Sequence, residues 1–174
     1  MTTPTAESLR SEHKLAAEQY LTFQLAEQHY GLDILCVQEI KCWERPTRLP
    51  HSQPYVQGVI NLRGAVVPII DLRRRFGLGE TAQSRTTVVI VVRVDAGSRG
   101  ELTAGLVVDA VCEVCSIETG QVHAPPGAEG GIDGQFVRGV AMMEQRMLVL
   151  LDVPRLIGAT LGERATLAIG SRAA

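Results

Sequence analysis

The sequence predicts an all-β fold built from small β-barrels. Short runs rich in valine, isoleucine, threonine and aromatic residues recur along the chain, and runs rich in glycine and proline separate them. The apolar runs predict about ten strands, whereas only three short segments are expected to be helical. This ratio favours small barrels over a parallel α/β sheet. No internal repeat is apparent in the sequence.

Composition limits the size of the fold and its possible partners. The 174 residues suit one domain, or two small ones that share a core. The net charge is −2, from 17 basic and 19 acidic residues, so no large basic field is available to hold phosphates. Aromatic residues make up 4% of the chain, too few for a base-stacking platform. We therefore expect no nucleic-acid partner.

The hydropathy pattern predicts a cytoplasmic protein. Residues 1–10 lack the apolar core of a signal peptide. The longest apolar runs, such as Val88 to Val92, are far too short to cross a bilayer, so no direct membrane insertion is expected. The four cysteines are then expected to be reduced thiols at small buried positions.

The first part of the chain predicts a tail followed by short strands. Asp33 is placed to cap a single helical turn. On the strand that follows, Val37 and Glu39 share one face, whereas Ile40 lies on the other. The expected segments are a tail at 1–18, strands at 20–25, 30–32 and 37–43, and a helical turn at 34–36.

The stretch 58–72 predicts a buried hairpin. Two apolar runs are broken once, at Arg63-Gly64, where glycine can adopt a positive φ in a tight turn. Pro68 cannot donate a ladder hydrogen bond, so its strand should lie at an edge, a bulge or a bend. Arg63 is a charged residue in the most apolar part of the chain, so it must reach water or a partner.

The remaining segments continue the alternation of strands and turns. Asp71 is placed to cap a brief helix, and Gly105 is a candidate bulge. The expected elements are a helix at 72–76, a connector at 79–85, a strand at 86–94, a hairpin loop at 95–100, one or two strands within 102–117, a loop at 118–135, a hairpin of 136–142 and 147–151, and a helix from Asp152 or Pro154.

Motifs for catalysis or cofactor binding are missing from the sequence. Cys112 and Cys115 stand without a second pair at zinc spacing, and the histidines show no helical ligand spacing. The glycine-rich segment 127–134 has no following lysine to meet a phosphate, so it is interpreted as a surface loop. Arg63 and Glu39 have two interpretations: separately solvated side chains, or a charge pair at the rim of an apolar groove that meets another protein.

Several motifs, in the order found here, resemble the CheW-like family of chemotaxis coupling proteins. The resemblance runs from about Tyr20 to Ile157. The Asn-Leu-Arg-Gly block with the following Pro and Asp-Leu-Arg is its most specific part. The matching segments are 30–35, 37–40, 58–64, 67–73, 87–91, 105–109 and 146–152.

The resemblance implies a fold and a role. Members are two five-stranded SH3-like barrels that pack on each other, with short helices and a C-terminal helix. We then expect an intertwined domain at 19–161, divided near residue 86, with flexible tails at 1–18 and 162–174. Members have no catalytic activity, cofactor or metal. They link the cytoplasmic hairpin tip of membrane-associated chemoreceptors to the regulatory domain of a CheA-type histidine kinase in arrays.

The resemblance also suggests site residues. The loop 121–127, which contains Val122 and His123, lies where relatives often carry a basic residue and an aromatic one for a second contact with the kinase. In this chain the loop has His123 and no aromatic residue. The candidates for receptor binding are Ile34, Val37, Glu39, Arg63, Val88, Val111 and Val114. The candidates for kinase binding are Ile40, Ala65, Val122 and His123.

Three alternatives remain open at this stage. The adaptor could serve a non-flagellar pathway that controls pili, gliding or second-messenger synthesis. The chain could be a fragment of a larger signalling enzyme, although it contains no ATP-binding or receiver motif. It could also be a barrel enzyme, which the lack of paired carboxylates or an activated nucleophile argues against.

Overall fold

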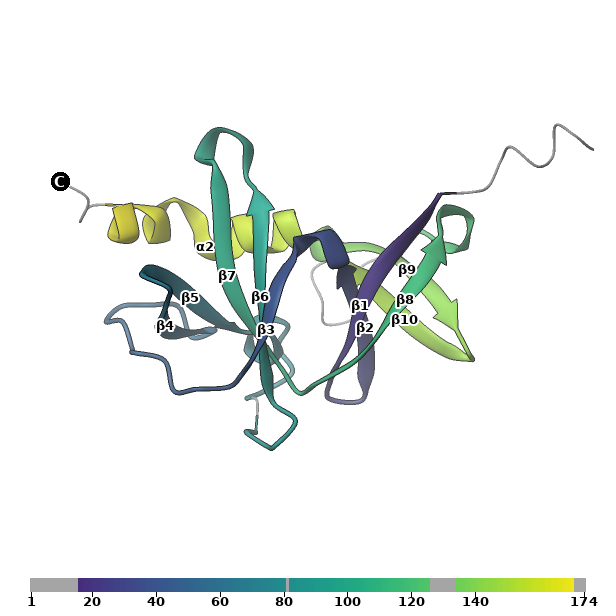
Figure 1. Cartoon of the computed structure of the whole chain (residues 1–174), viewed down its shortest axis with the longest axis horizontal. Helices are drawn as coiled ribbons and strands as arrows, with labels where there is room; N and C mark the ends of the chain where they lie inside the picture. The colour runs from purple at the N-terminus through teal and green to yellow at the C-terminus, as the bar shows by residue number, and fades with distance from the viewer. Residues whose placement is uncertain (1–15, 81, 126–133, 171–174) are drawn as a thin grey trace, which may run out of the picture.

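The computed structural model describes residues 16–80, 82–125 and 134–170, with the side chains of 163–170 left out. Ten strands form two five-stranded sheets, so the predicted all-β class is confirmed (Figure 1). The strands are β1 (Ala17–Leu25), β2 (Gln28–Asp33), β3 (Val37–Cys42), β4 (Val56–Leu62), β5 (Ala65–Asp71), β6 (Val88–Asp95), β7 (Glu101–Val108), β8 (Ala110–Glu118), β9 (Val137–Met143) and β10 (Arg146–Leu151). The helices are α1 (Leu72–Arg75) and α2 (Val153–Gly170), with 3₁₀ turns η1 (Ile34–Cys36), η2 (Gly97–Arg99), η3 (Thr119–Gln121) and η4 (Gly134–Phe136).

Each sheet closes into a small barrel. The first barrel has the strand order β8-β1-β2-β10-β9, and the second has β3-β6-β7-β5-β4. In the second barrel, Thr47 follows β3 and exchanges two backbone hydrogen bonds, of 2.9 and 2.8 Å, with Val59 of β4. In the first barrel, His123 follows β8 and pairs in the same way with Val140 of β9, at 2.8 and 2.9 Å. The two outer strands of each sheet are therefore joined through the segment after one of them.

The two halves of the chain have the same order of elements. If strands β1–β5 and β6–β10 exchange places in order, the strand order of one barrel becomes that of the other, and the parallel pair β10·β2 becomes the parallel pair β5·β7. Asp71 ends β5 and Asp152 comes directly after the equivalent strand β10, and each side chain accepts a hydrogen bond from the backbone N–H three residues on. The chain therefore contains a structural repeat that the sequence does not make apparent, because the two halves share strand pairing but few side chains.

The halves exchange their hairpins. β1 and β2 complete the barrel of β8–β10, whereas β6 and β7 complete the barrel of β3–β5. The boundary expected near residue 86 falls between the halves, but it does not separate the barrels. Each barrel needs strands from both sides of that boundary.

One core joins the barrels. Phe23 and Tyr30 of the first barrel stack at 5.7 Å, and Tyr30 stacks on Phe76 at 5.8 Å after α1. The same cluster contains Ile70, Leu106 and other residues of the second barrel, with the start of α2. Figure 1 shows α2 running from the first barrel across to the second. Burial of this continuous apolar cluster holds the two barrels together.

Local sequence features account for the hairpin of β4 and β5. The two-residue turn has positive φ at Arg63 (51°) and Gly64 (87°), the pattern of a type I′ turn. Asn61 Oδ1 accepts a hydrogen bond from the Gly64 N–H at 2.8 Å. Pro68 lies in a strand with neighbours on both sides, but β7 pairs only from Ile69 onward. Pro68 is therefore at a local edge, where a missing donor costs little.

Some expectations are wrong in detail. Gly105 is not at a bulge; it pairs regularly in β7, where an added Cβ would lie 2.6 Å from Ile69 Cδ1. Of the four cysteines, Cys115 is buried, Cys36 is intermediate, and Cys42 and Cys112 are exposed, because alternate strand positions face solvent. The helical backbone continues beyond residue 162 to Gly170, with a kink at Gly162. Residues 1–15 and 126–133, assigned to the tail and to a loop, lie outside the described residues.

Candidate partner-binding site

Arg63 and Glu39 form an ion pair across the second barrel. The turn of β4 and β5 presents Arg63, whose Nη1 lies 3.2 Å from Glu39 Oε1 and whose Nη2 donates to Oε2 at 3.4 Å. The Arg63 side chain is 73% exposed and that of Glu39 is 24% exposed. The charge-pair interpretation therefore describes the geometry better than two separately solvated side chains.

Glu39 is incompletely satisfied in this pair. Its Oε1 atom is buried and accepts no hydrogen bond of good geometry, although Arg63 is close enough for an ion pair. Because this oxygen is buried, a partner would meet the pair through the exposed Arg63 guanidinium group and not through Glu39 Oε1. At the equivalent turn of the second half the residues are Glu144-Gln145, so the Arg63 cation belongs to one barrel only.

Five aliphatic candidates lie on η1, β3, β6 and β8. Four of them are partly buried and pack against the core that joins the barrels, and the fifth is 50% exposed on β8. A partner that covered these positions would add to an existing apolar surface. The four packed residues are Ile34, Val37, Val88 and Val111, and the exposed residue is Val114.

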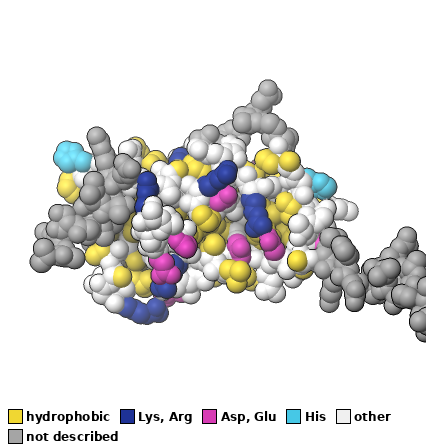
Figure 2. All heavy atoms as spheres, turned by 90° about the horizontal axis from the view of Figure 1, so that it is seen from above, with side chains coloured by type: hydrophobic (Ala, Val, Ile, Leu, Met, Phe, Trp, Pro, Cys, Tyr) yellow, Lys and Arg dark blue, Asp and Glu magenta, His cyan; other side chains and the backbone are white. Residues whose placement is uncertain are grey.

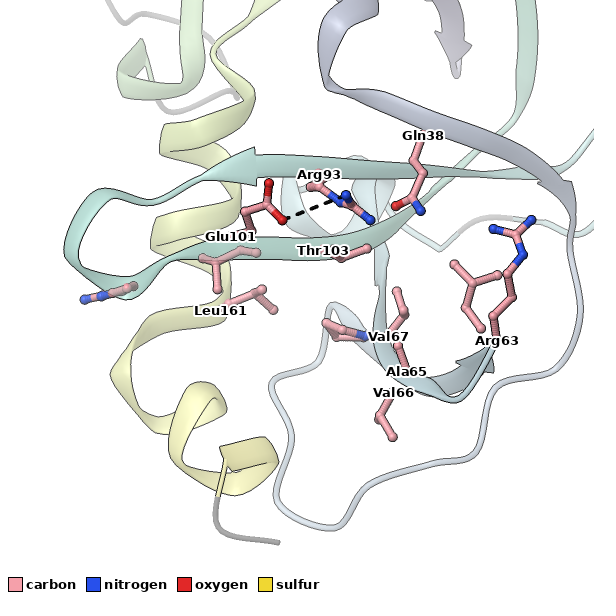
Figure 3. A pocket seen from close by; sticks show the side chains of 13 residues that line it. Gln38, Arg63, Ala65, Val66, Val67, Arg93, Glu101, Thr103 and Leu161 are labelled. Carbon is pink, nitrogen blue, oxygen red and sulfur yellow. Dashed lines mark ion pairs between the residues drawn. The ribbon is translucent and has the colours of Figure 1, made fainter. Parts of the chain in front are cut away.

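A groove of about 560 Å³ lies beside the Arg63 turn. Its floor comes from β5, and β7 and α2 form its other sides (Figure 3). Figure 3 shows Arg63 at one end and Leu161 of α2 at the other, with the Arg93–Glu101 ion pair of 3.8 Å above the floor. The groove exists because β5 and β7 are not paired before Ile69 and Gly105.

The groove distinguishes the two barrels. At the equivalent place in the first barrel, the hollow beside Glu144 has a volume of only about 50 Å³. β7 begins four residues before its first pair with β5, whereas β2 begins one residue before its first pair with β10. The longer overhang of β7 therefore supplies an extra wall in the second barrel.

The kinase candidates divide between the barrels. Ile40 is 46% exposed on β3, and Ala65 is exposed at the start of β5, where it lines the groove. Val122 is partly buried against the first barrel, and His123 is exposed in the closing bridge to Val140. The four residues therefore form two surfaces and not one.

Residues that sequence reasoning missed complete the groove. Val66 is 53% exposed, and Leu102 and Leu161 come from distant parts of the chain. The exposure of Val66 could have been inferred from its position beside the turn. The approach of Leu102 and Leu161 depends on tertiary packing, for which the sequence carries no local signal.

The surfaces around these residues carry mixed charges and cysteine thiols that are not activated. Figure 2 shows acidic and basic side chains interspersed with hydrophobic ones on one face. Burial raises the pKa of the Cys36, Cys112 and Cys115 thiols, which keeps them protonated. Within the described ranges there is no cluster of three or more His, Cys, Asp or Glu suited to a metal ion. No helix in the same ranges is long and apolar enough to span a bilayer.

The fold and the exposed groove define a two-barrel scaffold domain. Residues 19–160 match the family model for the CheW-like domain, and the chain belongs to this family. It is 36% identical over 153 residues to the chemotaxis protein CheW of Klebsiella aerogenes, covering 86% of this chain and 89% of that one. It is 34% identical over 145 residues to the probable chemotaxis protein CheW of Rhizobium etli, with 83% and 90% covered.

A solved structure and a differently named relative extend the comparison. The crystal structure of the scaffolding protein TtCheW from Thermoanaerobacter tengcongensis superposes with a TM-score of 0.72 at 35% identity. The match covers 82% of this chain and 88% of that chain. Protein FrzA of Myxococcus xanthus is 27% identical over 142 residues, with 80% and 85% covered. Proteins of the CheW family are chemotaxis scaffolds and not enzymes, and this chain is one of them.

Proposed function

We propose that this scaffold couples the cytoplasmic hairpin tips of chemoreceptors to a CheA-type histidine kinase and controls kinase activity in arrays at the membrane. The observation that carries the proposal is the Arg63–Glu39 pair at the end of an open apolar groove. Such a site suits a partner that brings an apolar anchor and a few orienting polar groups.

The receptor contact would use the junction of the barrels. The partly buried aliphatic residues Ile34, Val37, Val88 and Val111, with the exposed Val114, supply apolar area. Arg63, held in place by Glu39, would orient a helical hairpin laid across them. This division between apolar anchors and a polar contact is typical of helix-in-groove recognition.

The kinase contact would use both ends of the molecule. Ile40 and Ala65 offer one surface on the second barrel, and Val122 and His123 offer another on the first. Two such surfaces on one scaffold would allow it to contact two kinase regulatory domains in the same array. Many weak contacts in one array raise the overall avidity without new kinds of contact.

A second role follows from the likeness to FrzA. That relative carries a name other than CheW while matching most of this chain. The same surfaces could then couple receptors to a kinase in a non-flagellar pathway that controls pili, gliding or second-messenger synthesis. Measuring activity with kinase and receptor pairs from each pathway distinguishes the two roles.

The test measures kinase autophosphorylation with this protein and a receptor signalling fragment, added singly and together. We expect strong activation only in the full mixture, and its loss with Arg63→Glu. Arg155→Glu is the matched control, because the Arg155 side chain is 72% exposed against 73% for Arg63. The Kd for binding of the receptor fragment should be about tenfold higher or more for Arg63→Glu than for the unchanged chain.

The outcomes separate the parts of the proposal. Equal loss of activation in both arginine variants would mean a general charge effect and would remove the role of Arg63. Binding to the kinase without activation would favour the second role. Absence of binding to every kinase and receptor pair tried would refute both roles.

A further inference from the structure

A second hollow, of about 700 Å³, lies under the long connection between β3 and β4. Figure 1 shows this connection looping out beside β4. The hollow lies between the connection, the start of α1 and the segment around Glu80. Its lining is mainly polar, and it shares no residue with the groove at Arg63. The residues that carry the argument are Trp43, Arg45, Arg48, Gln57, Asp71 and Arg74.

One wall of the hollow is fixed by a chain of hydrogen bonds. The Trp43 indole N–H donates to Gln57 Oε1 at 3.2 Å, and Gln57 Nε2 donates to Asp71 Oδ2 at 3.2 Å. Asp71 is 1% exposed and also accepts the Arg74 backbone N–H at 3.3 Å. Because each polar group of this chain is satisfied, the wall is rigid before any ligand arrives.

The opposite side of the hollow is also held in place. Thr47 is bound to Val59 by two backbone hydrogen bonds, of 2.9 and 2.8 Å. Gly58 lies so close to the Thr47 carbonyl that no Cβ fits between them. The connection between β3 and β4 therefore packs closely against β4, so the hollow is formed before any ligand binds.

The charges in the hollow are unbalanced. Arg74 is paired with Glu80, lies 4.0 Å from Asp71 and donates to the Pro54 carbonyl at 3.1 Å. Arg45 and Arg48 line the same hollow, and neither forms an ion pair with any described residue. Two uncompensated guanidinium groups therefore face a polar space of molecular size.

We propose that this hollow binds a small anion that carries a phosphate group, such as a phosphate monoester or a diphosphate. The planar guanidinium group matches two phosphate oxygens at once and forms charge-assisted hydrogen bonds with them. The volume lies within the range of small-molecule sites. An acidic peptide would use a flatter surface, so the concave shape favours the small molecule.

Trp43 provides a built-in reporter, because the chain contains one tryptophan. The full chain is titrated with pyrophosphate at constant ionic strength, and the Trp43 indole resonance and the heat of binding are followed. We expect a saturable shift of that resonance. Arg45→Ala with Arg48→Ala should weaken binding by about tenfold or more, since each charged hydrogen bond contributes appreciably.

The matched control is the double variant Arg146→Ala with Arg155→Ala, which removes the same charge from other exposed positions. It should bind pyrophosphate as the unchanged chain does. A linear, non-saturable response, or equal weakening in both double variants, would overturn the proposal. A response to an acidic peptide but not to pyrophosphate would replace it with a protein contact. Neither result depends on receptors or kinase.

Discussion

Arg73 forms a bidentate ion pair with Asp109 and so joins the two halves of the chain. Arg73 Nε lies 2.9 and 3.0 Å from the two carboxylate oxygens, and Nη2 lies 2.5 Å from Oδ2. The hydrogen bonds to Asp109 raise the pKa of Arg73. Asp109 Oδ2 also accepts the Ala26 backbone N–H at 2.7 Å. One carboxylate therefore holds α1 and the turn between β1 and β2 in place.

Removal of that carboxylate should destabilise the fold. We expect Asp109→Ala to lower the free energy of unfolding by about 2 kcal/mol, because it leaves a half-buried guanidinium and a backbone donor unpaired. Arg73→Lys should cost less, because it keeps the charge but loses the fork geometry. Denaturant unfolding measures both. If Asp109→Ala lowers the free energy of unfolding by less than the error of the measurement, the ion pair does not contribute to stability.

Gly58 and Gly64 should respond differently to alanine. Gly58 has φ of 147° and an added Cβ would collide with the Thr47 backbone, whereas Gly64 has φ of 87° and nothing within 4 Å. We expect Gly58→Ala to cost about 3 kcal/mol or more and Gly64→Ala about 1 kcal/mol. Thermal and denaturant unfolding compare them, with Gly64→Asn as a control that tolerates positive φ. Equal costs would contradict the close approach of the β3–β4 connection to β4.

Glu18 and Tyr20 should make stability depend on pH at both extremes. The hydrogen bond from Tyr20, at 2.7 Å, is the main reason that the pKa of Glu18 lies below its ordinary value of 4.5. The stabilisation from Glu18 is then complete above pH 4.5 and is lost as the pH falls through the lowered pKa. Burial raises the pKa of Tyr20 above 10.0, so stability should also fall as the pH rises beyond that value.

The sign of these shifts can be measured directly. In Tyr20→Phe, the pKa of Glu18 should move up toward 4.5 when carboxyl resonances are followed by NMR. Tyr30→Phe is the control, because Tyr30 is also buried but forms no hydrogen bond with Glu18. An unchanged Glu18 pKa in Tyr20→Phe would assign the shift to Arg138, whose Nη2 lies 2.9 Å from Glu18 Oε2.

The exchange of hairpins predicts how a divided chain behaves. A cut in the connector between Gly77 and Thr86 separates β1–β5 from β6–β10, and each barrel needs strands from both parts. We expect neither part to fold as a monomer, and the mixture to regain the spectrum of the intact chain. Circular dichroism and NMR of the separate and mixed parts provide the check. A folded monomer of either part would refute the exchanged topology.

Local sequence was sufficient for the strands and for the turn that carries the candidate site. Alternating apolar residues, β-branched runs and the cap at Asp33 operate within a few residues, so their consequences could be predicted. Arg63-Gly64 was placed in a tight turn because two apolar runs surround it. The resemblance to CheW-like proteins added the role of a scaffold and named the candidate residues.

Tertiary structure alone decided which strands share a barrel. Val88 and Gly105 belong to strands that follow residue 86 in the sequence, yet they pair with β3 and β5, which precede it. Hydrogen bonds between strands form across long separations and leave no local pattern, so the structural repeat was not predicted. The resemblance to CheW-like proteins implied intertwined barrels, but not which strands they exchange. The groove at Leu161 and the basic hollow at Arg45 arise in the same way, from distant segments that meet only in the folded chain.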